Sequence, residues 1–302
     1  MEELFKKYVK HLELERSISP LTVRNYTSDV RGFLDFLRNN GVDSLDEVSR
    51  STMRRYLGWL HNEGIARGSM SRKLSALRSF YRYLDREDLV TVQPLSTLSA
   101  PKPQKRLPTF LTAEEMPRLV EAPDASTPQG LRDRAILELL YAAGLRVSEI
   151  VALDLKDVDL GSRQVRVWGK GAKERVVLMG MPAAAALKLY LDHARVKLQG
   201  KSDTQALFLN RFGDRIVQRR IQRLVTKYAR QAGIEMRVHP HVMRHTFATH
   251  LLDGGADLRV VQDLMGHAQL SATQVYTHVS QSQIRRKYLA AHPRSSARKG
   301  GQ

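Results

Sequence analysis

Apolar residues in the first ninety positions recur every three or four residues, the period of an amphipathic α-helix. Ser19 is a predicted helix cap and Pro20 suits the first helical position, so one helix is expected from there until Gly41 ends it. The same pattern recurs from Met70 to Leu84. Two more helices are expected at about 2–15 and 51–63. The pattern predicts an all-helical unit of four helices.

The second half of the chain mixes helical periods with short β-like stretches. Gly169, Lys170 and Gly171 have the composition of a tight turn between two of these strands. The strands are expected at 157–160, 164–168 and 175–178, and the helices at about 130–143, 182–197, 216–232, 241–252, 257–265 and 271–289. The expected fold class is mainly α with a small antiparallel β-sheet (α+β) in the C-terminal domain.

A proline-rich stretch separates the two halves. Between Val92 and Pro108 four prolines alternate with serine, lysine and arginine. Proline fixes the backbone and removes hydrogen-bond donors, so an extended basic linker is expected there. Just beyond it, Thr112 and Glu115 have the spacing of a capping box, although Pro117 fits poorly inside a helix that begins at that point.

The excess of basic residues indicates what kind of molecule the protein binds. The 302 residues include 49 Lys and Arg against 31 Asp and Glu, giving a net charge of +18. Residues 1–100 carry 16 basic and 13 acidic side chains, so the C-terminal part holds nearly all of the excess. Such a basic chain is typical of a protein that binds a polyanion, and nucleic acid is the leading candidate.

The composition also restricts the compartment and the metal chemistry. The chain has no cysteine, which excludes disulfides and thiolate metal sites and agrees with a reducing compartment. The first ten residues are charged and do not resemble a signal peptide, and no run of about 18 apolar residues occurs. We therefore expect a cytoplasmic protein without a membrane partner.

Several side chains near the C-terminus suit phosphate chemistry. Cleaving a phosphodiester without a metal requires a nucleophile, positive donors for the developing charge and an acid for the leaving oxygen. Tyr276 is the candidate nucleophile, and a capping box of Ser271 and Gln274 predicts that it lies in the second turn of a helix. A single helical tyrosine more often serves packing. His241 and Arg244, three residues apart, would face one phosphate from one side of a helix.

Zinc is an alternative use of these histidines. His239, His241, His245 and His250 lie close together in the sequence. His241 and His245 have an i, i+4 spacing, but no glutamate lies between them as a zinc protease requires, and cysteine is absent. The pattern argues against a metal site and for a site without cofactors.

Two further candidates lie upstream. Arg146 follows Gly144, which should end the preceding helix, and Glu149 is close enough to orient it. Lys170, in its Gly-Lys-Gly turn, could reach a leaving oxygen, although ordinary hairpin chemistry also explains it. The full phosphate-loop pattern is absent.

Taken together, these motifs resemble the tyrosine recombinase (phage integrase) family and, within it, the Xer-type site-specific recombinases. The resemblance covers nearly the whole chain. It includes Gly-Leu-Arg-Val-Ser-Glu at 144–149 and Gly-Lys-Gly at 169–171, and its most specific parts are His-Val-Met-Arg-His-Thr-Phe-Ala-Thr-His-Leu-Leu from 241, Met-Gly-His at 265–267 and Val-Tyr-Thr-His at 275–278.

The resemblance implies a role for each matching residue. Tyr276 matches the nucleophile, and Arg146 and Arg244 match the arginines that bind the scissile phosphate. Lys170 matches the lysine that protonates the departing 5′ oxygen, with Lys173 a weaker alternative. His241 matches the assisting base and His267 the histidine that supports the transition state. The implied product is a 3′-phosphotyrosine with a free 5′ hydroxyl, formed without ATP.

The resemblance also implies the domain plan, a two-domain C-shaped DNA clamp. The domains are a helical core-binding (SAM-like) domain at 1–92, the basic linker at 93–108, the catalytic domain at 109–292 and a disordered basic tail at 293–302. A C-terminal helix at about 281–291, with Ile284, Tyr288 and Leu289 on its apolar side, is expected to dock into a neighbouring protomer. Packing within its own chain is the alternative.

The implied partners are double-stranded DNA with a dif-like recombination site and further protomers, four on two duplexes. The implied role is resolution of chromosome and plasmid dimers at the nucleoid, for segregation at cell division. The sequence leaves open a paralogous recombinase partner and a DNA translocase. Its alternatives are a phage or mobile-element integrase, more remotely a nicking-closing topoisomerase, and a DNA-binding protein that does not cleave, which should lack one of the six residues.

Overall fold

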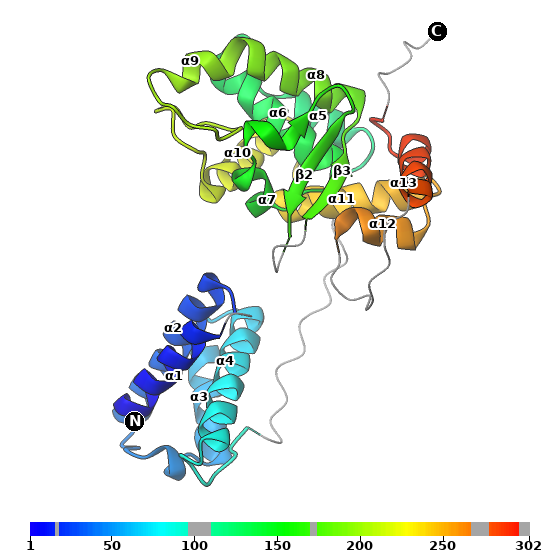
Figure 1. The fold of residues 1–302 in the computed structure, drawn as a ribbon. Helices are drawn as coiled ribbons and strands as arrows, with labels where there is room; N and C mark the ends of the chain where they lie inside the picture. The colour runs from blue at the N-terminus through cyan, green and yellow to red at the C-terminus, as the bar shows by residue number, and fades with distance from the viewer. Residues whose placement is uncertain (16–17, 96–109, 170–173, 267–277, 296–302) are drawn as a thin grey trace. The chain divides into compact units, whose positions relative to one another are not determined.

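The computed structural model describes residues 1–15, 18–95, 110–169, 174–266 and 278–295. The chain divides into two compact units, residues 1–107 and 108–302 (Figure 1). Each unit has its own hydrophobic core. The predicted fold class, mainly α with a small antiparallel sheet, is confirmed.

Helices alone build the described part of the N-terminal unit. Ser19 caps the second helix as predicted, because its Oγ accepts the Thr22 N–H at 3.2 Å and Pro20 opens the helix. Apolar stripes from all four helices meet in one core, where the rings of Phe33 and Tyr56 pack edge to face at 4.9 Å. The helices are α1 (Glu2–Leu14), α2 (Pro20–Asn39), α3 (Arg50–Asn62) and α4 (Arg67–Arg86), with a 3-10 turn at Leu45–Glu47.

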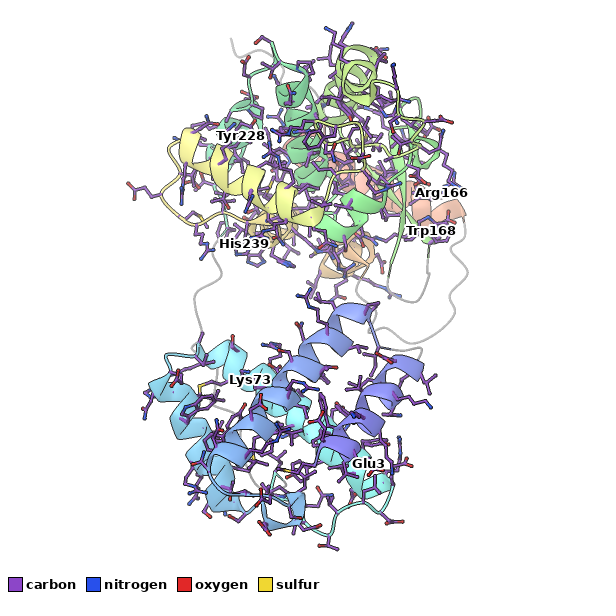
Figure 2. All side chains as sticks on the ribbon, turned by 90° about the vertical axis from the view of Figure 1, so that its left-hand side faces the viewer. Glu3, Lys73, Arg166, Trp168, Tyr228 and His239 are labelled. Carbon is purple, nitrogen blue, oxygen red and sulfur yellow. The ribbon has the colours of Figure 1, made fainter. Side chains whose placement is uncertain are left out.

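A buried carboxylate joins α2 to α4. Asp29 is almost fully buried and accepts hydrogen bonds from Arg72 and, at 3.1 Å, from Nζ of Lys73, which is labelled in Figure 2. A carboxylate with two cationic donors fixes how two helices register against each other. Arg72 and Lys73 therefore bind a carboxylate of their own unit.

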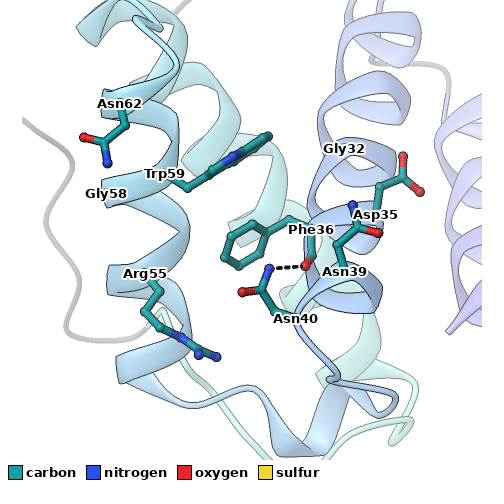
Figure 3. A pocket seen from close by; sticks show the side chains of 9 residues that line it. All are labelled: Gly32, Asp35, Phe36, Asn39, Asn40, Arg55, Gly58, Trp59 and Asn62. Carbon is teal, nitrogen blue, oxygen red and sulfur yellow. Dashed lines mark hydrogen bonds between the residues drawn. The ribbon is translucent and has the colours of Figure 1, made fainter.

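A groove of about 600 Å³ lies between α2 and α3 (Figure 3). Trp59 forms one wall and packs on Phe36 with ring centroids 5.5 Å apart, while Gly32 and Gly58 leave open space beside them. None of the six predicted catalytic residues lines this groove.

The C-terminal unit is built around one buried helix. Thr127 caps α6 and Pro128 opens it, and nearly every later residue of α6 is buried. Thr112 and Glu115 form the predicted capping box, with bonds of 2.9 and 3.2 Å. Pro117 lies in the first turn of the helix, where no backbone donor is lost. The helices are α5 (Glu115–Glu121), α6 (Pro128–Ala142), α7 (Val147–Ala152), α8 (Met181–Leu189), a π-helical stretch (Tyr190–Arg195), α9 (Val196–Gln199), α10 (Gln218–Gln231), α11 (Pro240–Asp253), α12 (Leu258–Met265) and α13 (His278–Ala291).

The three strands form an antiparallel sheet in the order β1-β2-β3. They are β1 (Val158–Asp159), preceded by a 3-10 turn at Leu155–Asp157, β2 (Gln164–Trp168) and β3 (Glu174–Leu178). Val165 pairs with Val177 and Val167 with Arg175, so one face of the hairpin carries buried valines together with an arginine. The first strand is shorter than the 157–160 predicted.

The end of the chain packs on its own C-terminal unit. Tyr288 is 1% exposed and donates from its hydroxyl to the Ala142 carbonyl at 2.9 Å. Arg294 donates to the buried Glu138 carboxylate at 2.5 Å, and the backbone N–H of Met181 donates to the Ser295 carbonyl at 3.3 Å. In this structure Tyr288 therefore packs within its own chain, which was the alternative to docking into a neighbouring protomer. The Glu138 ion pair and the backbone bond hold Arg294 and Ser295 on the unit. The disordered tail expected at 293–302 stays a prediction, and residues 296–302 lie outside the described residues.

Candidate active site

Arg146 is held at a sharp chain reversal between α6 and α7. Gly144 ends α6 with φ +56°, a conformation that favours glycine, and Arg146 occupies the cap position before α7. Glu149 reaches back to both ends of Arg146: it accepts the backbone N–H at 2.8 Å and the side-chain Nη1 at 3.0 Å. Glu149 thus orients Arg146, as the sequence predicted.

Glu149 also binds a second arginine. Arg175 of β3 donates Nη1 and Nη2 to the two carboxylate oxygens of Glu149 at 2.8 and 3.0 Å. Burial alone raises the pKa of Glu149, but the bonds from Arg175 and Arg146 outweigh it, and the pKa lies below its ordinary value. Glu149 is therefore a buried carboxylate anion between two arginines.

Arg244 lies on α11 and is almost fully buried. Its Nη1 donates to the Gly144 carbonyl and its Nη2 to the Met265 carbonyl, both at 2.5 Å. Burial, together with repulsion from Arg146, lowers the pKa of Arg244 to about 10. The guanidinium still carries its charge at neutral pH.

Arg146 and Arg244 converge on the turn that ends α12. Nη2 of Arg146 lies 3.5 Å from the Gly266 carbonyl, next in sequence to the Met265 carbonyl that Arg244 binds. Gly266 has φ +64°, and a Cβ atom there would lie 3.0 Å from Nε of Arg175. The two arginines therefore meet directly before His267 in the sequence.

Bonds to the described residues do not use all the donors of Arg146 and Arg244. A guanidinium has five N–H groups, and in each of these arginines two of them make the side-chain bonds described above. Within the described part of the chain, three N–H groups on each side chain have no hydrogen-bond partner. Two such forks match the geometry of phosphate oxygens.

The structure places His241 in the first turn of α11, exposed, with its ring 6.0 Å from that of His239. His245 is exposed on the same helix, whereas His250 is buried and bonds the Tyr141 hydroxyl at 2.7 Å. In the described part of the chain no group of three or more acidic, histidine or cysteine side chains has the geometry to hold a metal ion.

Three of the six predicted residues can be located and three cannot. Arg146 and Arg244 come together, and His241 lies one turn before Arg244 on the same helix. Lys170, His267 and Tyr276, like Lys173, Ser271 and Gln274, lie outside the described residues. Arg175 is not among the six residues predicted from the sequence. Its signal was an arginine at an inward position of a strand, opposite Val167.

A basic surface lies on α10. One side of this helix is buried. The other side carries exposed basic residues from the first turn to the last: Arg219, Arg220, Arg223, Lys227 and Arg230. Tyr228, on the buried side, marks the helix in Figure 2. This density of exposed cations is typical of a surface that meets a polyanion.

Comparison with known proteins identifies the class. Residues 109–283 match the phage integrase family, and residues 5–88 match the phage integrase N-terminal SAM-like domain. The chain therefore belongs to the phage integrase family of tyrosine recombinases.

Its relatives are Xer-type recombinases, and the chain is a tyrosine-type site-specific recombinase of that kind. It is 44% identical to the tyrosine recombinase XerC of Bacillus pumilus (strain SAFR-032), over 98% of both chains. It is 40% identical to XerD of Staphylococcus epidermidis (strain ATCC 35984), over 98% of this chain and all of the relative.

Solved structures share the fold. A XerH recombinase bound to a palindromic difH substrate aligns with a TM-score of 0.71 and 22% identity, over 94% of this chain and 84% of that one. A lambda integrase fragment on a core site aligns with a TM-score of 0.67 and 17% identity, over 94% of this chain and 95% of that one.

Among the described residues no helix is both long and apolar enough to cross a membrane.

Proposed function

We propose that the chain cuts and rejoins double-stranded DNA through a covalent 3′-phosphotyrosine on Tyr276. The observation that carries this proposal is the convergence of Arg146 and Arg244 on the turn before His267. Both guanidinium groups are fixed by protein acceptors before any ligand binds. Fixed charges of this kind stabilise a transition state without reorganising.

In the proposed step the phenolic oxygen of Tyr276 attacks the scissile phosphorus, and the bond from phosphorus to the 5′ oxygen breaks. His241 takes the phenolic proton and Lys170 gives a proton to the leaving 5′ oxygen, so the products are a 3′-phosphotyrosine and a 5′ hydroxyl. Arg146, Arg244 and His267 hydrogen-bond the phosphate oxygens as charge builds on them. Attack by a 5′ hydroxyl reverses the step and rejoins the strand.

We propose that α10 and the basic C-terminal unit bind the DNA backbone. The net charge of +18 and the exposed cations of α10 support this role. Each phosphate neutralised releases counterions, so affinity for duplex DNA should fall steeply with salt. We further propose that the N-terminal unit (1–92), the linker (93–108) and the catalytic unit (109–292) act together as a clamp on the duplex.

The assembly we propose is a tetramer on two duplexes, each with a dif-like site, that resolves chromosome and plasmid dimers in the cytoplasm at the nucleoid before cell division. The XerC and XerD relatives support it, because they match this chain nearly end to end. An integrase role has less support, because the lambda and Tn1549 integrase structures are 17% and 18% identical to this chain, whereas the XerC and XerD relatives are 44% and 40% identical. A paralogous recombinase and a DNA translocase are further partners to test by adding each to the purified protein.

The test uses a nicked suicide duplex that carries the target site, so that the cleaved strand diffuses away and the covalent complex accumulates. Wild-type protein should give a DNA-linked band on a denaturing gel, and Tyr276→Phe should give none. Tyr83→Phe is the matched control, since Tyr83 packs through its ring on His11 in the N-terminal unit. A missing band at concentrations that saturate DNA binding, or a band that persists in Tyr276→Phe, contradicts the mechanism.

A further inference from the structure

A single buried carboxylate serves two arginines in the candidate active site. The side chain of Glu149 is 3% exposed. Its Oε1 accepts Nη1 of Arg146 at 3.0 Å and Nη1 of Arg175 at 2.8 Å. Its Oε2 accepts the backbone N–H of Arg146 at 2.8 Å and Nη2 of Arg175 at 3.0 Å. The two arginine side chains therefore share one negative charge.

The two arginines do not share this charge equally. Arg175 binds both carboxylate oxygens in a fork, whereas the side chain of Arg146 binds only one of them. The fork is the stronger arrangement. The side chain of Arg175 is 16% exposed and that of Arg146 is 39% exposed. Arg175 is thus the enclosed cation that neutralises the carboxylate, and Arg146 is the more exposed partner.

The position of Arg175 in the sheet is unusual for a cation. Arg175 pairs across the hairpin with Val167, which is buried, and an apolar residue is normal at an inward strand position. A buried ion pair adds little net stability over well-packed apolar side chains of similar size. Packing alone therefore does not explain an arginine here, and its effect on neighbouring charges is the better account.

The same charges act on Arg244. Burial is the main cause of its lowered pKa, and the charges of Arg146 and Arg175 lower that pKa further. The charge of Glu149 acts in the opposite direction. Three guanidinium groups thus lie within electrostatic reach of one carboxylate, so positive charge is in excess. Removal of Arg175 would take away part of that excess and leave the carboxylate paired with Arg146 alone.

We infer that Arg175 is a positioning residue that neutralises Glu149, so that the charge of Arg146 is available to the scissile phosphate. This inference rests on the proposed function. Without Arg175, both oxygens of Glu149 would be open to a fork with Arg146, and that fork would draw the Arg146 guanidinium away from a phosphate. A carboxylate enclosed in protein attracts a cation more strongly than one in water does. Glu149 would then compete with the phosphate for Arg146.

The experiment measures single-turnover strand cleavage by the whole chain, at saturating protein, on two suicide duplexes. One duplex has the natural phosphodiester. The other has a methylphosphonate at the scissile position, where a methyl group replaces one charged oxygen. The methylphosphonate is neutral, so its cleavage depends less on neutralisation by arginine. The rate of each variant is divided by the rate of wild type on the same duplex.

The variants separate the charge of Arg175 from its packing. Arg175→Met removes the charge and keeps a long side chain, whereas Arg175→Lys keeps the charge. The double variant Arg175→Met with Glu149→Gln removes both charges of the pair. Arg166→Met is the matched control, because Arg166 lies on β2 of the same hairpin, is half exposed and pairs with Glu174 at 3.8 Å (Figure 2). Arg175→Gln, which is also neutral, replaces Arg175→Met if thermal melting shows that the latter does not fold.

Arg175→Met should slow cleavage of the natural duplex by about 10–100-fold, which is less than the about 10²–10³-fold expected when a donor to a developing oxyanion is lost entirely. On the methylphosphonate duplex its rate should lie within about threefold of wild type, because the charge that Arg146 must neutralise is absent. The double variant should recover most of the loss on the natural duplex, because Arg146 then has no competing anion. Arg175→Lys should show a smaller defect than Arg175→Met, and Arg166→Met none.

Three outcomes overturn the inference. If Arg175→Met cleaves the natural duplex as fast as wild type, Arg175 does not support Arg146. A defect that is equally large on both duplexes assigns Arg175 to packing. A double variant as slow as Arg175→Met shows that Arg175 does not act through Glu149. Failure of the proposed function looks different, because wild-type protein itself would then form no covalent complex with the natural duplex.

Discussion

Arg294→Met tests how firmly the end of the chain is held on its own C-terminal unit. Arg294 donates to Glu138 at 2.5 Å and to Glu121 at 3.2 Å. The side chain of Glu138 is 1% exposed, whereas that of Glu121 is about half exposed. The substitution therefore leaves one buried carboxylate without its cation.

The magnitude follows from that burial. Removing one partner of a buried ion pair costs about 3–5 kcal/mol, and the exposed Glu121 pair adds at most about 1 kcal/mol. The unfolding free energy of the C-terminal unit should fall by about 3–5 kcal/mol at pH 7. Combining Arg294→Met with Glu138→Gln removes the stranded charge and should recover part of this loss.

The loss should depend on pH. Burial raises the pKa of Glu138, and Arg294 partly opposes that rise. In Arg294→Met the largest opposing influence is lost and only the weaker attraction of Arg134 remains, so the folded state holds its proton to higher pH than the unfolded chain does. The penalty is present at pH 7 and is released as pH falls toward the ordinary carboxyl pKa.

The assay is urea unfolding followed by circular dichroism at pH 7 and pH 5, with each variant compared with wild type at the same pH. Hydrogen exchange of residues 285–295 and of the Met181 amide separates local release of the chain end from unfolding of the unit. A variant as stable as wild type, or a loss equal at both pH values, refutes this account of the ion pair.

Three further predictions test other parts of the structure. Gly144→Ala should lower the unfolding free energy by about 2–4 kcal/mol, because its Cβ would lie 2.3 Å from Cδ1 of Phe247 at φ +56°. It should also slow cleavage, because it would disturb the carbonyl that Arg244 binds. Thermal melting and suicide-duplex cleavage rates check the two effects, and a variant that matches wild type in both contradicts the geometry. Burial lowers the pKa of His292 to about 3, so stability should fall by about 2 kcal/mol from pH 7 to pH 5 as the unfolded chain takes up a proton; His292→Gln should flatten that dependence, and an unchanged slope refutes it. Finally, DNA affinity should fall by orders of magnitude between about 50 and 200 mM salt, and a shallow slope in an anisotropy titration argues against extensive phosphate contact.

Much of the local structure could be predicted because local signals decide it. Ser19 and Pro20 start α2 where capping chemistry requires, and the Thr112 and Glu115 box forms as its spacing indicates. The alternation of the two longer strands placed the hairpin. These signals act over a few residues, so they are legible in the sequence.

The rest depends on contacts between distant segments. Nothing near Arg175 in the sequence indicates that Glu149, 26 residues earlier, would bind it. The docked chain end depends on Glu138 of α6, 156 residues before Arg294. An ionic pair across such separations has no periodicity, and only the folded chain reveals it.

The candidate site divides in the same way. The order of the sequence motifs predicted six catalytic residues. The structure brings Arg146 and Arg244 to one turn and places His241 on the same helix as Arg244. The positions of Lys170, His267 and Tyr276 stay predictions of the sequence and of the family. Their roles now depend on chemical tests.

The most direct test identifies the amino acid joined to DNA. The covalent complex from a suicide duplex is digested with protease and nuclease, and the nucleotide-bearing peptide is sequenced by mass spectrometry. Our account predicts one modified residue, Tyr276, linked to a 3′ phosphate, with a free 5′ hydroxyl on the released strand. A phosphate on any other side chain, or a link to the 5′ end, would contradict it.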